Sequence, residues 1–143
     1  MYCRKPEERE RTITMKNVFT EKAPNAIGPY SQAKICGGMV YTSGQIAINP
    51  ETNEFEGGTI AEQTKRVCEN LCAVLEAAGT DITMAVKTTC FLKDIGDFAE
   101  FNKVYGEYFT GKPARSCVGG LSLPKGALVE IEVVAQAEKG TEE

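Results

Sequence analysis

The chain has 143 residues, a length that fits one domain with a hydrophobic core of its own. Apolar residues make up 42% and charged residues 25% of the chain, as in ordinary globular proteins. The net charge of −4 argues against broad nucleic-acid binding, which needs a basic surface. The sequence contains no apolar run of membrane-spanning length and no signal-peptide pattern at its charged N-terminus, so we expect a cytoplasmic protein.

The six cysteines do not form a recognisable metal-binding pattern. No C-x-x-C pair occurs, and the chain has no histidine. Cys68 and Cys72 have helical spacing but lack further ligands nearby to complete a zinc site. We therefore expect no zinc site among the cysteines, and we interpret most of them as reduced, small core residues.

The first part of the chain predicts a charged extension followed by strands. Residues 1–14 are mostly charged and predict a flexible extension, so that a single domain covers 15–143. A first strand is predicted within 15–20. Two more strands, at 32–37 and 39–44, are separated by a glycine and predict a hairpin. A short strand and a loop rich in turn formers follow up to residue 58.

The clearest helix spans residues 59–79. Thr59 and Glu62 have the spacing of a capping box, and Gly79 is a natural C-terminal stop. The apolar residues of this segment recur at helical spacing, so one face is expected to pack on a sheet. The next segment, 84–93, is rich in β-formers and predicts a strand.

A second amphipathic helix is predicted over 96–109, with Asp97 as its cap and an aromatic face. Two strands follow, at 114–120 and 127–137, and the last alternates between apolar and polar residues. The predicted order is β-β-β-α-β-α-β-β, an α+β fold with one sheet and both helices on one face. The other face mixes apolar residues with glutamates, which indicates an oligomer.

The stretch "PARSC" places the guanidinium of Arg115 two residues from the thiol of Cys117. In an extended segment these two side chains share a face. A nearby guanidinium can lower the pKa of a thiol, which would make Cys117 reactive.

Several fragments together resemble the reactive intermediate deaminase family, the Rid or YjgF-like proteins. They are "APNAIGPYSQA", "TSGQIAINPET", "VKTTCFLKDIGDFAEFNKVY", "PARSCV" and "LPKGALVEIEVVA". The resemblance covers about residues 15 to 137. It implies a chorismate-mutase-like fold of the bacillus type, in a homotrimer whose sheets form a central β-barrel and whose active sites lie between subunits.

The same resemblance implies an activity without a cofactor. It is the hydrolysis of 2-enamine and 2-imino acids, such as 2-aminoacrylate, its tautomer 2-iminopropionate and 2-iminobutanoate, to 2-keto acids and ammonia. The expected partners are thus small 2-imino and 2-keto acids and further copies of the chain, with no membrane and no nucleic acid.

Three residues match the family's catalytic positions. Arg115 would bind the substrate carboxylate through two parallel hydrogen bonds; the other interpretation is an ion pair with Glu130 or Glu132. Glu130 would position or deprotonate the attacking water, and Glu132 is its main competitor. Cys117 would line the pocket, through either its backbone or its side chain, unless it is a core residue.

Four further residues match pocket positions of the family. Tyr30 of "GPY" would close the pocket or serve only in packing. Asn102 would contact substrate, cap a structural element or bridge subunits. Ser43 would hydrogen-bond in the pocket, and Gly44 would permit a close backbone approach or a positive φ.

One departure and two other functions complete the sequence-based expectations. Gly119 and Gly120 follow "SCV", where many relatives carry a larger residue, which predicts a wider pocket or a looser strand. The alternative functions are an endoribonuclease that inhibits translation and a non-catalytic trimer that senses keto acids.

Overall fold

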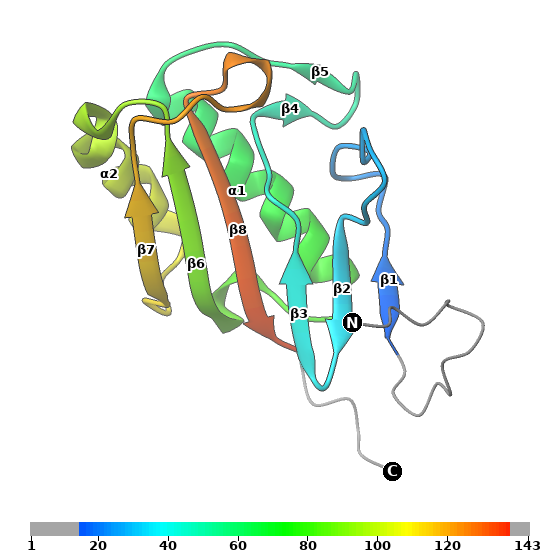
Figure 1. Ribbon diagram of the computed structural model, residues 1–143. Helices are drawn as coiled ribbons and strands as arrows, with labels where there is room; N and C mark the ends of the chain where they lie inside the picture. The colour runs from blue at the N-terminus through cyan, green and yellow to red at the C-terminus, as the bar shows by residue number, and fades with distance from the viewer. Residues whose placement is uncertain (1–14, 138–143) are drawn as a thin grey trace, which may run out of the picture.

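The computed structural model describes residues 15–137, so the predicted extension 1–14 lies outside the described residues. A six-stranded sheet with the strand order β1-β2-β3-β8-β6-β7 forms one layer (Figure 1). The β6–β7 pair is parallel, and every other neighbouring pair is antiparallel. The strands of this sheet are β1 (Lys16–Val18), β2 (Ala33–Cys36), β3 (Met39–Thr42), β6 (Ala85–Leu92), β7 (Ala114–Val118) and β8 (Val129–Gln136).

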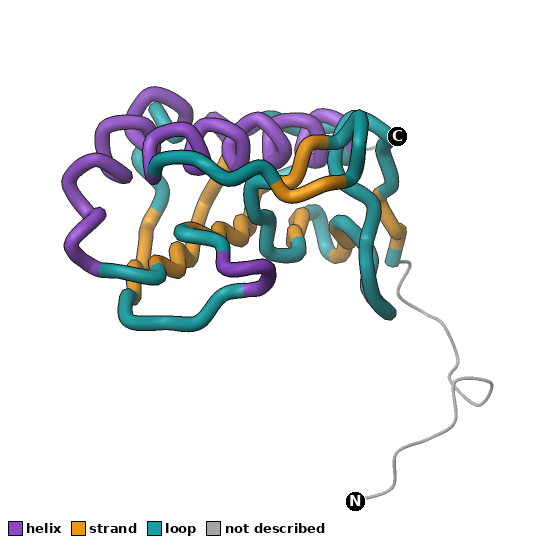
Figure 2. The backbone as a smooth tube through the Cα atoms, turned by 90° about the horizontal axis from the view of Figure 1, so that it is seen from above, coloured by secondary structure: helices purple, strands orange, loops and turns teal. Residues whose placement is uncertain are grey.

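Two helices, α1 (Ile60–Ala77) and α2 (Phe98–Tyr108), cover one face of this sheet, as Figure 2 shows from above. The α+β class and the placement of both helices on one face are as predicted. The structure adds a small second sheet formed by β4 (Ile48–Asn49) and β5 (Glu54–Phe55), where the sequence predicted one short strand and a loop. No helix within residues 15–137 is long and apolar enough to cross a membrane.

Helix α1 follows its sequence pattern closely. The backbone N–H of Glu62 donates to the Thr59 hydroxyl at 3.2 Å, and the Glu62 carboxylate accepts from the same hydroxyl. Gly79 has a φ of +83°, a conformation that favours glycine and ends the helix. The predicted apolar face is buried throughout; it consists of Ile60, Thr64, Val67, Leu71, Val74, Leu75 and Ala78.

Helix α2 begins differently from the prediction. Asp97 makes no capping hydrogen bond with its side chain and has helical backbone angles. Asp94 instead accepts from the N–H of Gly96 at 2.8 Å and caps a short turn, Ile95–Asp97, that leads into the helix. Asp97 therefore occupies the predicted N-cap position of α2 but does not cap the helix with its side chain, because a 3₁₀ turn capped by Asp94 precedes the α-helix.

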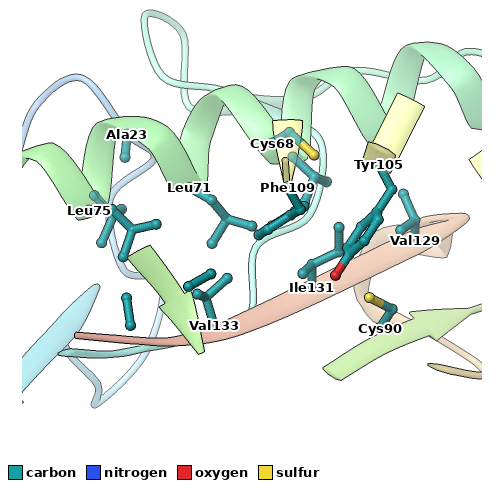
Figure 3. Close-up of a cluster of buried hydrophobic side chains, with 14 of the residues drawn as sticks. Ala23, Cys68, Leu71, Leu75, Cys90, Tyr105, Phe109, Val129, Ile131 and Val133 are labelled. Carbon is teal, nitrogen blue, oxygen red and sulfur yellow. The ribbon is translucent and has the colours of Figure 1, made fainter. Parts of the chain in front are cut away.

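The core lies between the helices and the sheet (Figure 3). Strand β8 alternates as predicted, with its buried residues facing α1 and its remaining residues on the face without helices. Figure 3 shows Ile131 and Val133 on this strand beneath Leu71 and Leu75 of the helix layer. Cys68 and Cys90 are fully buried in this core, which confirms the core interpretation for those two cysteines.

Gly119 is in close contact with the loop before α2, which corrects the expectation of a wider pocket. A Cβ atom at Gly119 would lie 2.7 Å from the Ile95 Cβ and 2.9 Å from the Ile95 backbone nitrogen. The space of the missing side chain is thus filled by Ile95 rather than left open.

Gly119→Ala is expected to destabilise the protein by about 1–3 kcal/mol, because the added methyl group overpacks a contact that includes backbone atoms. Thermal unfolding of the variant measures this effect. Gly57→Ala is the control, since a Cβ atom there meets no heavy atom within 4 Å. Equal melting temperatures for Gly119→Ala and wild type would contradict the close contact.

Candidate functional site

Glu130 and Gly44 form the centre of the first half of the site. Glu130 lies on β8, on the sheet face without helices, and is partly buried. A Cβ atom at Gly44 would lie 2.9 Å from the Glu130 Cδ and would overlap a carboxylate oxygen. Gly44 therefore permits the close approach that the sequence predicted, and the group that approaches it is the Glu130 side chain.

A cavity of about 80 Å³ adjoins this carboxylate. Tyr30, Gly44 and Glu130 lie on its wall, and an adjoining open depression also reaches Ser43 and Glu132. The apolar part of the cavity wall was not predicted; it includes Ile27, Ile46, Ile48 and Pro124. These residues come from three segments that are far apart in the chain, one of them including the start of β4, and no local sequence pattern brings them together.

The hydroxyl groups of Tyr30 and Ser43 both bond to neighbouring backbone. The Ile27 N–H donates to the Tyr30 hydroxyl at 3.2 Å, and the Tyr30 side chain remains half-exposed. The Ser43 hydroxyl donates to the Ser31 carbonyl at 2.6 Å. Ser43 thus ties two loop segments together beside the cavity, and the half-exposed Tyr30 lies on the cavity wall.

Burial raises the pKa of the Glu130 carboxyl, and the nearby Glu132 carboxylate raises it further. The sequence left open whether burial or Arg115 would dominate this pKa. In the structure burial dominates, and Arg115 does not contribute to the pKa of Glu130. A carboxyl group with a raised pKa is suited to accept and return a proton.

Arg115 forms the second half of the site, between β7 and α2. Its Nη1 donates to the Asn102 Oδ1 at 2.8 Å. Its guanidinium carbon lies 4.7 Å from the ring centre of Tyr105, and the rings of Phe98 and Phe101 lie at 5.3 and 5.7 Å. The aromatic face of α2 was predicted, but its contact with Arg115 was not.

Cys117 lies on the same face as Arg115, as predicted from their spacing, and both side chains are partly buried. The expectation of a lowered thiol pKa was wrong. Burial raises the pKa of Cys117, and the opposing effect of Arg115 is smaller. A thiol in this state is mostly protonated at neutral pH and is a weak nucleophile.

The two halves lie on opposite faces of the sheet. Arg115 is paired with Thr88, which is paired with the buried Val133 on the helix-covered face. Glu130 is paired with Phe91, which belongs to the other face because side chains alternate along a strand. One chain therefore does not bring Arg115 and Glu130 together, and the suggested ion pair between them is not formed.

No carboxylate within residues 15–137 lies within ion-pairing distance of Arg115. Over the same residues, no group of three or more His, Cys, Asp or Glu is arranged to hold a metal ion. Arg115 thus keeps most of its donors for another acceptor, and Glu130 lines the cavity of about 80 Å³.

Comparisons with known proteins agree on one family. Residues 20–137 match the family model described as endoribonuclease L-PSP. A RutC family protein of Pyrococcus abyssi is 53% identical over 122 residues, which cover 85% of this chain and 96% of that protein.

Two solved structures are similar in both sequence and fold. The Rid family protein YyfA from Yersinia pestis is 48% identical with a TM-score of 0.84, over 87% of this chain and all of that one. TdcF of E. coli, solved with bound serine, is 41% identical with a TM-score of 0.80, over 85% and 98% of the two chains.

Proposed function

Because this chain belongs to the Rid (YjgF-like) family, we propose that it hydrolyses 2-enamine and 2-imino acids to 2-keto acids and ammonia. The representative substrate is 2-aminoacrylate, which tautomerises to 2-iminopropionate and gives pyruvate; 2-iminobutanoate is a second substrate of the same kind. The reaction adds water across a C=N bond and needs no redox step. We also propose that the protein carries out this reaction in the cytoplasm.

The observation that carries the proposal is the environment of Arg115. Its guanidinium is partly buried and fixed by one hydrogen bond to Asn102 and by aromatic rings. A guanidinium has five N–H donors in a planar fork that matches a carboxylate. Every 2-imino acid and 2-keto acid carries such a carboxylate. TdcF, whose fold is similar, was solved with serine, a 2-amino acid that also carries one.

Glu130 performs the proton transfers in this proposal. As a carboxylate it takes a proton from the water that attacks the C=N carbon. The resulting carbinolamine has its amino and hydroxyl groups on the same carbon. With the substrate entering as its iminium form, the carboxyl group then returns the proton to the nitrogen. The C–N bond breaks as the hydroxyl oxygen forms the C=O bond and gives its proton to Glu130, which releases ammonia and the keto acid. Cys117 contributes its backbone rather than a nucleophilic thiol, in keeping with its raised pKa.

We place each complete site between two copies of the chain. Arg115, Asn102 and Cys117 come from one copy, and Glu130 with the Tyr30 and Gly44 region comes from its neighbour. This arrangement follows from the opposite faces on which Arg115 and Glu130 lie. A closed homotrimer with the open sheet faces forming a central barrel supplies three equivalent clefts.

The test is a direct assay of the wild-type protein on freshly generated 2-aminoacrylate. We expect pyruvate and ammonia to appear faster than in buffer alone, since fixed charges and an oriented water lower the barrier. An incubation with single-stranded RNA runs in parallel.

Each contrary result points to a different function. RNA cleavage with an unchanged rate of pyruvate formation would favour the endoribonuclease. Binding of pyruvate without any acceleration would favour the keto-acid sensor. Sedimentation of the same sample reports whether the active species is a trimer.

A further inference from the structure

We propose that Tyr105 is a positioning residue for Arg115 and that the buried hydroxyl of Thr88 holds Tyr105 in place. This inference rests on the proposed function, in which Arg115 binds the substrate carboxylate. It assigns to a core tyrosine a role in setting the position and direction of the guanidinium.

The ring of Tyr105 is the nearest of the three aromatic rings to Arg115, at 4.7 Å from ring centre to guanidinium carbon. It is itself packed between two rings: the Phe109 ring, just after α2, is stacked on it at 4.3 Å, and the Phe101 ring within α2 lies 5.4 Å away. Only 8% of Tyr105 is exposed. Arg115 therefore rests on a ring that has little freedom to move.

The hydroxyl of Tyr105 fixes the remaining freedom of this side chain. It lies 2.7 Å from the hydroxyl of Thr88, which is fully buried. The Cys90 thiol donates to the same Thr88 oxygen at 3.9 Å. Figure 3 shows the Tyr105 oxygen directed at the sheet, beside Cys90 and Ile131. A buried hydroxyl without a partner is costly, so the Thr88–Tyr105 pair holds the ring in one orientation.

Thr88 connects the ring to the strand that carries the cation. Thr88 lies on β6 and is the direct neighbour of Arg115 on β7. The sheet therefore fixes Arg115 at its backbone, while Thr88 and Tyr105 fix the height of its guanidinium above the sheet. Asn102 uses one donor, at Nη1, and the other donors stay available to a carboxylate. A pre-positioned guanidinium loses less freedom on binding and therefore binds more tightly.

The test uses four substitutions that separate the ring, its hydroxyl and the general packing of α2. Tyr105→Leu removes the ring, and Tyr105→Phe keeps it. Thr88→Val leaves the tyrosine hydroxyl without its partner, and the double variant Thr88→Val with Tyr105→Phe removes both hydroxyls. Tyr108→Leu is the control, because Tyr108 packs on the same core from the same helix without contacting the guanidinium.

The first readout is the ¹⁵N NMR signal of the Arg115 Nε–H in ligand-free protein, identified by its loss in Arg115→Lys. We expect ring currents to shift this signal in the wild type, in Tyr105→Phe and in Tyr108→Leu. The shift should be clearly reduced in Tyr105→Leu, where only the rings of Phe98 and Phe101 remain near the guanidinium, altered in Thr88→Val and restored in the double variant. The second readout is pyruvate affinity, which we expect to fall about 10-fold in Tyr105→Leu and less than about 2-fold in Tyr105→Phe.

The outcomes distinguish this inference from the function on which it rests. An unchanged Nε–H signal in Tyr105→Leu would overturn the positioning role, whatever the activity. The substitutions could change the Nε–H signal as expected while the wild-type protein binds no pyruvate. That result would overturn the carboxylate role of Arg115 and support its contact with Tyr105. Equal losses of pyruvate affinity in Tyr105→Leu and Tyr108→Leu would show that Tyr105 acts only as a core residue and would overturn the inference.

Discussion

Arg115→Ala is expected to lower kcat/KM for 2-aminoacrylate by about 100-fold or more, which leaves little beyond the uncatalysed rate. Hydrogen-bonded charge pairs in a cleft contribute about 2–5 kcal/mol when one partner is truncated. Arg115→Lys is expected to lose most of the activity too, because an ammonium group is a point charge that cannot form two parallel hydrogen bonds or stack on Tyr105 in the same way. Pyruvate formation, corrected for the rate without enzyme, measures both losses.

Lys103→Ala is the control for this experiment. Lys103 lies on α2 beside Asn102 and is exposed, so its removal changes the local charge equally without touching the guanidinium. The control should keep the wild-type rate. A wild-type rate in Arg115→Ala would remove the carboxylate assignment, and with it the main support for the proposed reaction.

Glu130→Gln is expected to lower kcat by about 100-fold, since a positioned acid–base group contributes about 10²–10⁴-fold. In the wild type the activity should rise with pH as Glu130 deprotonates. That rise should occur above the usual range for glutamate, because burial and Glu132 raise the pKa of Glu130. Rates measured from pH 4.5 to 8.5 report both effects.

The same substitution changes the pH dependence of stability. A carboxyl whose pKa is raised on folding stabilises the folded state fully at pH values below its unfolded pKa of about 4.3. That contribution is lost as the pH rises through the folded pKa. Glu130→Gln should therefore be at least as stable as the wild type at pH 8 and should lose its relative advantage toward pH 4.5. Thermal unfolding at the two pH values checks the sign.

Glu132→Gln separates the two glutamates of this strand. It removes the charge that raises the pKa of Glu130, so the activity profile should move to lower pH while its plateau remains. A loss of the plateau in Glu132→Gln, with Glu130→Gln still active, would transfer the acid–base role to Glu132.

The elements could be predicted where local chemistry determines them. The 3.6-residue period and the Thr59 cap were enough for α1, and alternation was enough for β8, because each signal lies within one segment. The start of α2 was not predictable in this way. Asp94 and Asp97 are equally good capping residues in the sequence, and the structure shows Asp94 capping a 3₁₀ turn whose Ile95 packs on Gly119.

The candidate residues of the site could be named from the sequence, but their relative positions could not. The motif comparison identified Arg115 and Glu130, but their opposite faces depend on the register of β6 against both β7 and β8. Register is a property of paired strands, and one strand's pattern does not determine it. The contact of Arg115 with Tyr105 depends on the same pairing, together with the docking of α2 on the sheet.

The opposite orientation of Arg115 and Glu130 has a genetic consequence. If each working cleft draws one residue from each of two chains, a defect in either is not confined to the copy that carries it. Two inactive alleles, one damaged at each position, would rebuild intact clefts when co-expressed. A single damaged allele would instead impair clefts shared with healthy copies. The phenotype of a mutation would then depend on which copies assemble together, and not on the mutated polypeptide alone.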